Sequence, residues 1–323
     1  MKKLHIILLI STIVIGIFSV SMAKKYVLQP TRGTESNVTF AEDLVVEMQA
    51  GPMKVIPLTA ASKTDLMSFR KLVAKELPNA KNDPSIHYSI DESRGLISFS
   101  RGMQQYQGSF RPVLPSPENA ADLSLDFLKT SGMLPKNADQ LKLVHNGGLR
   151  AAAVTRGKKG PTIDKLRTLT YGREIDGIPV TGEGSRIIVN VGDKGSIVSV
   201  IHRWKDDAGK GRVVSIKEMK SLEAAKKEIL KVIANEFSGK AKVNEIQQIY
   251  YNGNGNYIQP VYAFVAEISN PGIPTAEYFG VIPAMLKAPE PVDLHRRDDK
   301  KALEVIQQSN QKNPPKVSVE QLD

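Results

Sequence analysis

The 323-residue chain contains no cysteine. Disulfides, thiolate metal sites and thiol nucleophiles are therefore excluded, and the fold must rest on the burial of apolar surface alone. If residues 1–23, the apolar N-terminal segment described below, are set aside, 300 of the 323 residues remain. A chain of that length buries about three quarters of the surface that its unfolded form exposes. The length favours two or three compact units.

Catalytic motifs are also lacking. The sequence has no His-Glu-x-x-His zinc motif, no Gly-x-Ser-x-Gly elbow, no phosphate-binding loop and no dinucleotide fingerprint. The paired carboxylates Asp206 and Asp207 lie in a hydrophilic segment, where no apolar pocket is expected to raise a carboxyl pKa. We therefore predict a protein that is not an enzyme and that has no cofactor, no metal and no catalytic residue. An enzyme with an unrecognised site built on His87 or His202 is the third-ranked alternative.

Long apolar runs are confined to the N-terminus. Lys2 and Lys3 precede an apolar run over residues 6–22, and Ser21-Met22-Ala23 places small residues at the −3 and −1 positions. This pattern predicts a secretory signal peptide cleaved after Ala23, and hence a periplasmic or extracellular bacterial protein. The alternative is an uncleaved helix that anchors the chain in the membrane.

Basic residues outnumber acidic ones, giving a formal charge of +10, which becomes +8 once Lys2 and Lys3 leave with the signal. An exported protein is not expected to meet nucleic acid, so the counter-surfaces are anionic envelope polymers, lipid headgroups or an acidic protein. A glycine-rich basic loop is expected after a strand over residues 141–145. Its candidate anionic contacts are Arg150, Arg156, Lys158 and Lys159, and the alternative is a solvated loop.

Residues 166–204 form the stretch around which we expect the chain to be organised. Ile187, Val189 and Val191 alternate with side chains of a different character, which is the period of a strand with two unlike faces. Residues 192–195, Gly-Asp-Lys-Gly, supply the positive φ angles of a short hairpin turn. We expect a three-stranded antiparallel meander.

A helix followed by strands recurs three times. The first predicted helix is capped by Ser62 and closed by Pro78, and the second begins at Ser116-Pro117 and ends at Gly132. The third begins at the capping-box pair Ser215 and Glu218 and ends at Gly239. The predicted fold class is α+β, built from tandem helix-plus-antiparallel-sheet modules.

The predicted boundaries follow this repeat, with the polar segment 205–211 as the best candidate boundary. They are a signal peptide (1–23), a linker (24–42), an N-terminal α+β module (43–112), a central α+β module (113–205), a C-terminal α+β module (212–287) and a polar mobile tail (288–323).

The central stretch resembles two related groups, the propeptides of thermolysin-like metalloproteases and the PepSY-type (cystatin-like) modules of exported bacterial proteins. Their shared pattern is a Tyr, then Gly-x-Pro-Val-x-Gly, a strand, a glycine turn and a strand. It is carried here by Tyr171, Ile175, residues 177–180, Gly182, 187–191, Gly195, Ile197 and Trp204, with 259–264 and 281–284 similar to the closing strands. No catalytic domain follows, so the resemblance implies a stand-alone binding or inhibitory module.

We therefore expect a binding or regulatory protein of the bacterial envelope. It would engage a protein partner, such as a peptidase, by pairing an extended segment with a sheet edge or by docking on a sheet face. The alternative is binding of an anionic envelope polymer or of lipid headgroups through basic loops; membrane contact otherwise requires an uncleaved signal. The candidate partner contacts are Tyr171, Ile178, Pro179, Trp204, Tyr250 and Tyr257.

Overall fold

The computed structural model describes residues 35–59, 85–91, 95–155, 158–237, 239–270 and 273–292. The predicted signal peptide, the first predicted helix (62–78), Arg156 and the tail beyond Val292 lie outside these residues. A compact unit ends at Val292, and the module boundaries proposed within it stay a prediction. No helix in the described part of the chain has the length and hydropathy that crossing a bilayer requires.

The dominant element is a mixed sheet to which thirteen of the described strands belong. The strands are β1 (Val38–Glu47), β2 (Lys54–Pro57), β3 (Ile86–Asp91), β4 (Leu96–Arg101), β5 (Leu141–Thr155), β6 (Lys158–Ile175), β7 (Ile178–Thr181), β8 (Arg186–Val191), β9 (Ile197–Arg203), β10 (Arg212–Val213), β11 (Lys240–Tyr251), β12 (Tyr257–Asn270) and β13 (Ile273–Pro283). The described residues form two α-helices, α3 (Pro117–Thr130) and α4 (Leu222–Glu236), and the short 3-10 turns η1 (Glu35–Asn37), η2 (Met103–Tyr106), η3 (Ala138–Gln140), η4 (Asp193–Gly195) and η5 (Ile216–Glu218).

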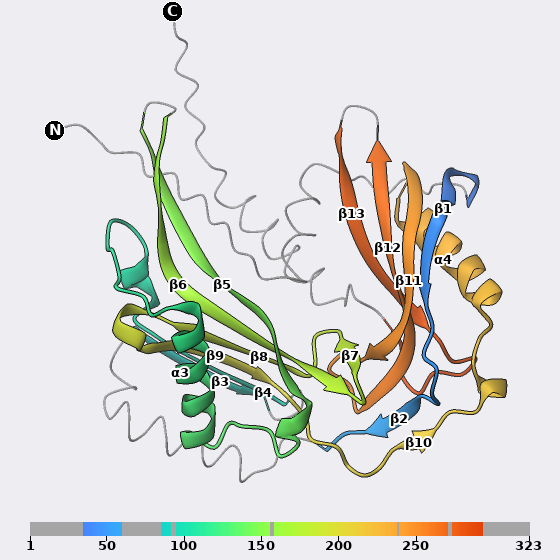
Figure 1. Cartoon of the computed structure of the whole chain (residues 1–323), viewed down its shortest axis with the longest axis horizontal. Helices are drawn as coiled ribbons and strands as arrows, with labels where there is room; N and C mark the ends of the chain where they lie inside the picture. The colour runs from blue at the N-terminus through green and yellow to red at the C-terminus, as the bar shows by residue number, and fades with distance from the viewer. Residues whose placement is uncertain are drawn as a thin grey trace, which may run out of the picture. The chain divides into compact units, whose positions relative to one another are not determined.

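One half of the sheet carries α3, and we call it the α3 half: β3, β4, β5, β6, β8 and β9. The expected meander is present, because β8 pairs antiparallel with both β6 and β9. Its inward residues, among them Leu169, Val189 and Val200, are fully buried and belong to one core with Leu128 of α3. Figure 1 shows α3 beside the strands of this half. The predicted cap is confirmed, since the Ser116 hydroxyl accepts a hydrogen bond from the Asn119 N–H at 3.2 Å.

The other half carries α4, and we call it the α4 half: β1, β11, β12 and β13. Ile229 and Ile233 of α4 pack on Val243, Phe264 and neighbouring buried residues. The predicted capping box, Ser215 with Glu218, caps the N-terminus of η5 rather than that of α4. Ser221 caps α4 instead, its hydroxyl accepting from Ala224 N–H at 3.2 Å.

Strands from all three proposed modules join this one sheet, so the predicted fold class of tandem helix-plus-sheet modules is wrong. β4 of the first module pairs with β9 of the second, and β1 pairs in parallel with β11 of the third. β7 pairs with β6 on one side and with β11 on the other. Unpaired strand edges are costly, and these pairings satisfy them across the proposed modules.

The resemblance to PepSY-type and protease-propeptide modules is also wrong. Such a module is a small unit of helix plus sheet, whereas residues 166–204 contribute to a large sheet of mixed strand direction. The local pattern of Tyr171, the residues after Gly177 and the Gly195 turn reflects hairpin chemistry, which recurs in many β proteins.

Candidate functional site

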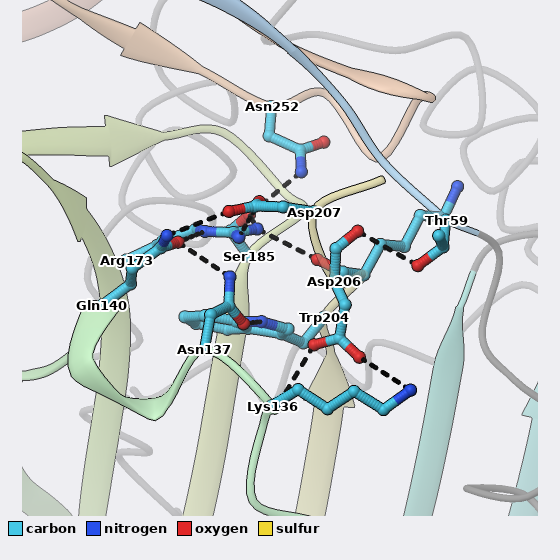
Figure 2. Close-up of polar contacts among 11 residues, drawn as sticks. Thr59, Lys136, Asn137, Gln140, Arg173, Ser185, Trp204, Asp206, Asp207 and Asn252 are labelled. Atoms are coloured by element: carbon cyan, nitrogen blue, oxygen red, sulfur yellow. Dashed lines mark hydrogen bonds and ion pairs between the residues drawn. The ribbon is translucent and has the colours of Figure 1, made fainter. Parts of the chain in front are cut away.

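A buried polar cluster lies where β6, the segment after β9 and the β11–β12 turn meet (Figure 2). Its centre is Arg173 of β6, whose side chain has no exposed surface. Arg173 Nε donates to Gln140 Oε1 at 2.6 Å, and Nη1 donates to the Lys205 carbonyl at 3.0 Å. Nη2 pairs with the carboxylate of Asp207. The guanidinium is thus held from three directions.

Trp204 and Asn252 extend this cluster on its two sides. The Arg173 guanidinium lies 4.8 Å from the centre of the Trp204 ring, a cation–π contact. Trp204 Nε1 donates to Asn137 Oδ1 at 3.0 Å, and Asn252 Nδ2 donates to the Ser185 hydroxyl at 3.0 Å. The cluster therefore links the α3 half to the β11–β12 turn of the α4 half.

The electrostatics of the cluster are those of a closed ion pair. Burial lowers the pKa of Arg173, and the nearby Asp207 carboxylate opposes that shift. A guanidinium stays protonated in proteins, so Arg173 cannot exchange a proton with a substrate. The cavity beside Trp204, His202 and Asp206 measures about 30 Å³, which is room for a water molecule rather than a substrate. The cluster is suited to holding strands together.

The sequence contained a signal for Arg173 that composition alone did not reveal. Leu169, Tyr171 and Ile175 share the inward face of β6, and Arg173 falls at the same period. A charge at a buried strand position requires a buried partner. Asp207 could not be matched to it from the sequence, because the two residues are 34 positions apart.

A groove of about 390 Å³ opens beside the first turns of α3. Its lining combines apolar and charged residues: Val113, Leu114, Pro115, Asn119, Asp122, Leu123, Asp126, Lys194 and Gly195. Lys194 N–H donates to the Val113 carbonyl at 2.8 Å, and Val113 N–H donates to Asp193 Oδ1 at 2.6 Å. These two hydrogen bonds join the η4 turn to the segment before α3 at the groove.

The free edge of β5 is a second exposed feature. Among the described strands β5 pairs with β6 alone, and its register shifts at Leu143/His145, Leu149/Arg150 and Ala152/Val154. The pairing is regular between the first two shifts, over residues 145–149. Leu143 and Val144, just before this run, are 43% and 61% exposed.

The candidate partner contacts predicted from the sequence are scattered. Tyr171, Trp204 and Tyr250 are buried, Ile178 and Tyr257 are half-buried, and Pro179 is exposed. The Tyr171 hydroxyl hydrogen-bonds to Ser124 of α3, and the Tyr250 hydroxyl accepts from Lys54 N–H at 3.0 Å.

The basic loop expected after residue 145 is instead a two-stranded ribbon formed by β5 and β6. Arg150 lies in β5 and forms an ion pair with Asp164 at 2.9 Å. Lys158 and Lys159 open β6. No three His, Asp or Glu side chains among the described residues are grouped so that they could hold a metal ion.

Comparisons with known proteins add the following. No family model matches the chain, and no curated protein does. A solved structure, that of an uncharacterized protein from Eubacterium rectale ATCC 33656, is similar with 11% sequence identity and a TM-score of 0.42, over 78% of this chain and 92% of that one.

Proposed function

We propose that this chain is an exported, non-enzymatic binding protein of the bacterial envelope that engages an extended segment of a protein partner along the free edge of β5. The observation that carries the proposal is the side of this 15-residue strand that pairs with no other described strand. An extended peptide gains main-chain hydrogen bonds by adding to such an edge.

The regular run over residues 145–149 is the expected docking window. Bulges disrupt strand pairing, so the shifts on either side of this run limit the docked segment to about five residues. Gly147 and Gly148 lie within the window, where the His145 imidazole and the Leu166 carbonyl fill the space that a side chain would take. A partner is therefore expected to bind this part of the edge through its main chain. The exposed apolar pair Leu143 and Val144 lies at one end and would meet an apolar partner residue.

A displayed library of random extended peptides, selected against the purified chain, tests this proposal. We expect enrichment of segments with alternating apolar residues, and loss of their binding in the double variant Leu143→Lys, Val144→Lys, because edge lysines disfavour strand pairing. Ile216→Lys is the matched control, since Ile216 is 88% exposed but lies outside every strand.

Two results would contradict the edge mechanism. One is the absence of any enriched peptide. The other is binding that survives in the double variant and is lost in Leu123→Lys, which would place the partner in the groove beside α3.

A further inference from the structure

The sheet of the α3 half has a second face that α3 does not cover. Tyr171 of β6 and Ile187 of β8 form a register pair and both point into the core with α3. Side chains alternate along a strand, so the neighbouring residues Gly172 and Arg186 point to the opposite face. Arg203 pairs with Arg186 across β8 and β9 and shares that face.

Charges gather at this end of the face. Arg203 Nη1 lies 3.3 Å from Glu183 Oε2, and Lys142, which pairs with Gly172 in the β5–β6 ladder, lies 3.7 Å from Glu174. Arg186 lies beside the Glu183 carboxylate, whose charge acts on it without a direct ion pair among the described residues. Glu183 therefore faces two arginines, Arg186 and Arg203.

The Arg186 guanidinium also lacks a hydrogen-bond acceptor at one nitrogen. Its Nη1 is shielded from solvent and has no partner among the described residues. Burial lowers the pKa of Arg186, the adjacent Arg203 charge acts in the same direction, and the Glu183 carboxylate opposes both. A buried guanidinium nitrogen without an acceptor is unfavourable, and an anion at this position would supply both the missing acceptor and a second negative charge for the two arginines.

We infer that Arg186 and Arg203 form a binding site for an oxyanion, a phosphate or a carboxylate group. Guanidinium groups bind both through two parallel N–H···O hydrogen bonds. The Arg203 and Glu183 side chains are 31% and 38% exposed, so the site opens to solvent on their side. The oxyanion could be free phosphate or a group on an anionic envelope polymer, which share this chemistry.

This site does not include the basic residues predicted from the sequence as anionic contacts. Arg150 already has a carboxylate partner in Asp164, at 2.9 Å. The site also makes no use of the β5 edge, so it stands or fails independently of the proposed function.

Calorimetric titration of the full chain with inorganic phosphate, and separately with acetate, at constant ionic strength tests the inference. We expect saturable binding of at least one anion. The dissociation constant should rise about tenfold or more in Arg186→Gln and in Arg203→Gln, because each removes charge-assisted hydrogen bonds. Arg150→Gln, an exposed and ion-paired arginine on a strand, is the matched control and should bind as the unmodified chain does.

The inference is overturned if neither anion binds saturably, or if both variants bind as tightly as the control. Should Arg186→Gln fail to fold by circular dichroism, Arg203→Gln carries the test, because that side chain is partly exposed. Polyphosphate and poly-L-glutamate then identify the source. A lower dissociation constant per site for the polymer than for the free anion indicates a polymeric ligand. Equal dissociation constants indicate that the free anion is the ligand.

Discussion

The α3 half and the α4 half of the sheet use the same device to hold a helix and differ on the faces that the helices leave uncovered. In each half a buried tyrosine hydroxyl ties the helix to the sheet. Tyr171 hydrogen-bonds to Ser124 within α3, and Tyr262 donates to the Lys220 carbonyl, just before α4, at 2.8 Å. Burial raises the pKa of both tyrosines.

The two halves differ on the sheet faces that α3 and α4 leave uncovered. In the α3 half this face carries Arg186 and Arg203. In the α4 half, Glu245 pairs with Val265, and Val265 pairs with Phe279, on the face opposite buried Phe264. The sheet faces that pack on the helices are similar, because both must exclude water. The uncovered faces need not exclude water and can therefore differ in charge. Ligand preference is therefore expected to reside on the uncovered faces.

The largest expected effect comes from breaking the cluster that links the two halves. Asp207→Ala removes the carboxylate that pairs directly with fully buried Arg173 and leaves only the weaker influence of Asp206 and Asp139 on its charge. We expect a loss of about 4 kcal/mol in the free energy of unfolding, measured by urea denaturation. Arg150→Gln, which breaks an exposed ion pair, should cost less than about 1 kcal/mol. Equal losses in the two variants would contradict a linking role for Arg173.

The second largest effect concerns whether the α3 half and the α4 half unfold in one cooperative transition. Leu128→Ala in α3 and Ile229→Ala in α4 each create a cavity at a fully buried position, and each should cost about 3 kcal/mol. If the halves are coupled, both variants lower the midpoint of one shared transition. Two separate transitions, each moved by only one of the variants, would show that the halves are independent. Fluorescence of Trp204, in the α3 half, followed alongside circular dichroism distinguishes these outcomes.

The smallest expected effect concerns two capping carboxylates, Glu118 in the first turn of α3 and Glu218 in the 3-10 turn η5 that precedes α4. Hydrogen bonds from backbone N–H groups and from Ser116 or Ser215 lower the pKa of Glu118 and of Glu218. A lowered carboxyl pKa stabilises the fold above the ordinary value of 4.5, and this contribution is lost as the pH falls through the lowered pKa. Glu118→Gln and Glu218→Gln should each flatten the acid limb of a stability-versus-pH curve. Unchanged limbs would refute the assignment.

Local elements were predictable from the sequence where short-range chemistry decides them. The helix that begins after Ser116 and the strand around Val189 follow from a cap with proline and from a two-residue period. The overall fold was not predictable in this way, because it depends on pairings between distant strands. Val38 of β1 pairs with Ala241 of β11, and no local pattern specifies that partner.

Glycine caused a further error. Gly147 and Gly148 indicated a loop, yet both lie within β5. A Cβ atom built on Gly148 would lie 1.9 Å from the carbonyl oxygen of Leu166, so glycine is required there by a close approach of two backbones. A sequence pattern alone does not separate this use of glycine from a turn.

The candidate sites were less predictable than the elements. The paired carboxylates Asp206 and Asp207 appeared to lie in hydrophilic surroundings, whereas Asp207 faces the most buried arginine of the described chain. Arg186 precedes the inward residue Ile187, so the sequence indicates only that it points outward. That its Nη1 has no hydrogen-bond acceptor among the described residues depends on the tertiary structure.

The parallel pairing of β1 with β11 sets an order of events during synthesis. Gln49, just after β1, bonds to Gln248, which lies 199 positions later. The ribosome must therefore add about two hundred residues before this N-terminal strand meets its neighbour, and at 5–20 residues per second that takes roughly ten to forty seconds. Among the described strands β1 pairs with β11 alone, so during that interval its backbone groups have none of the strand partners seen in the folded structure.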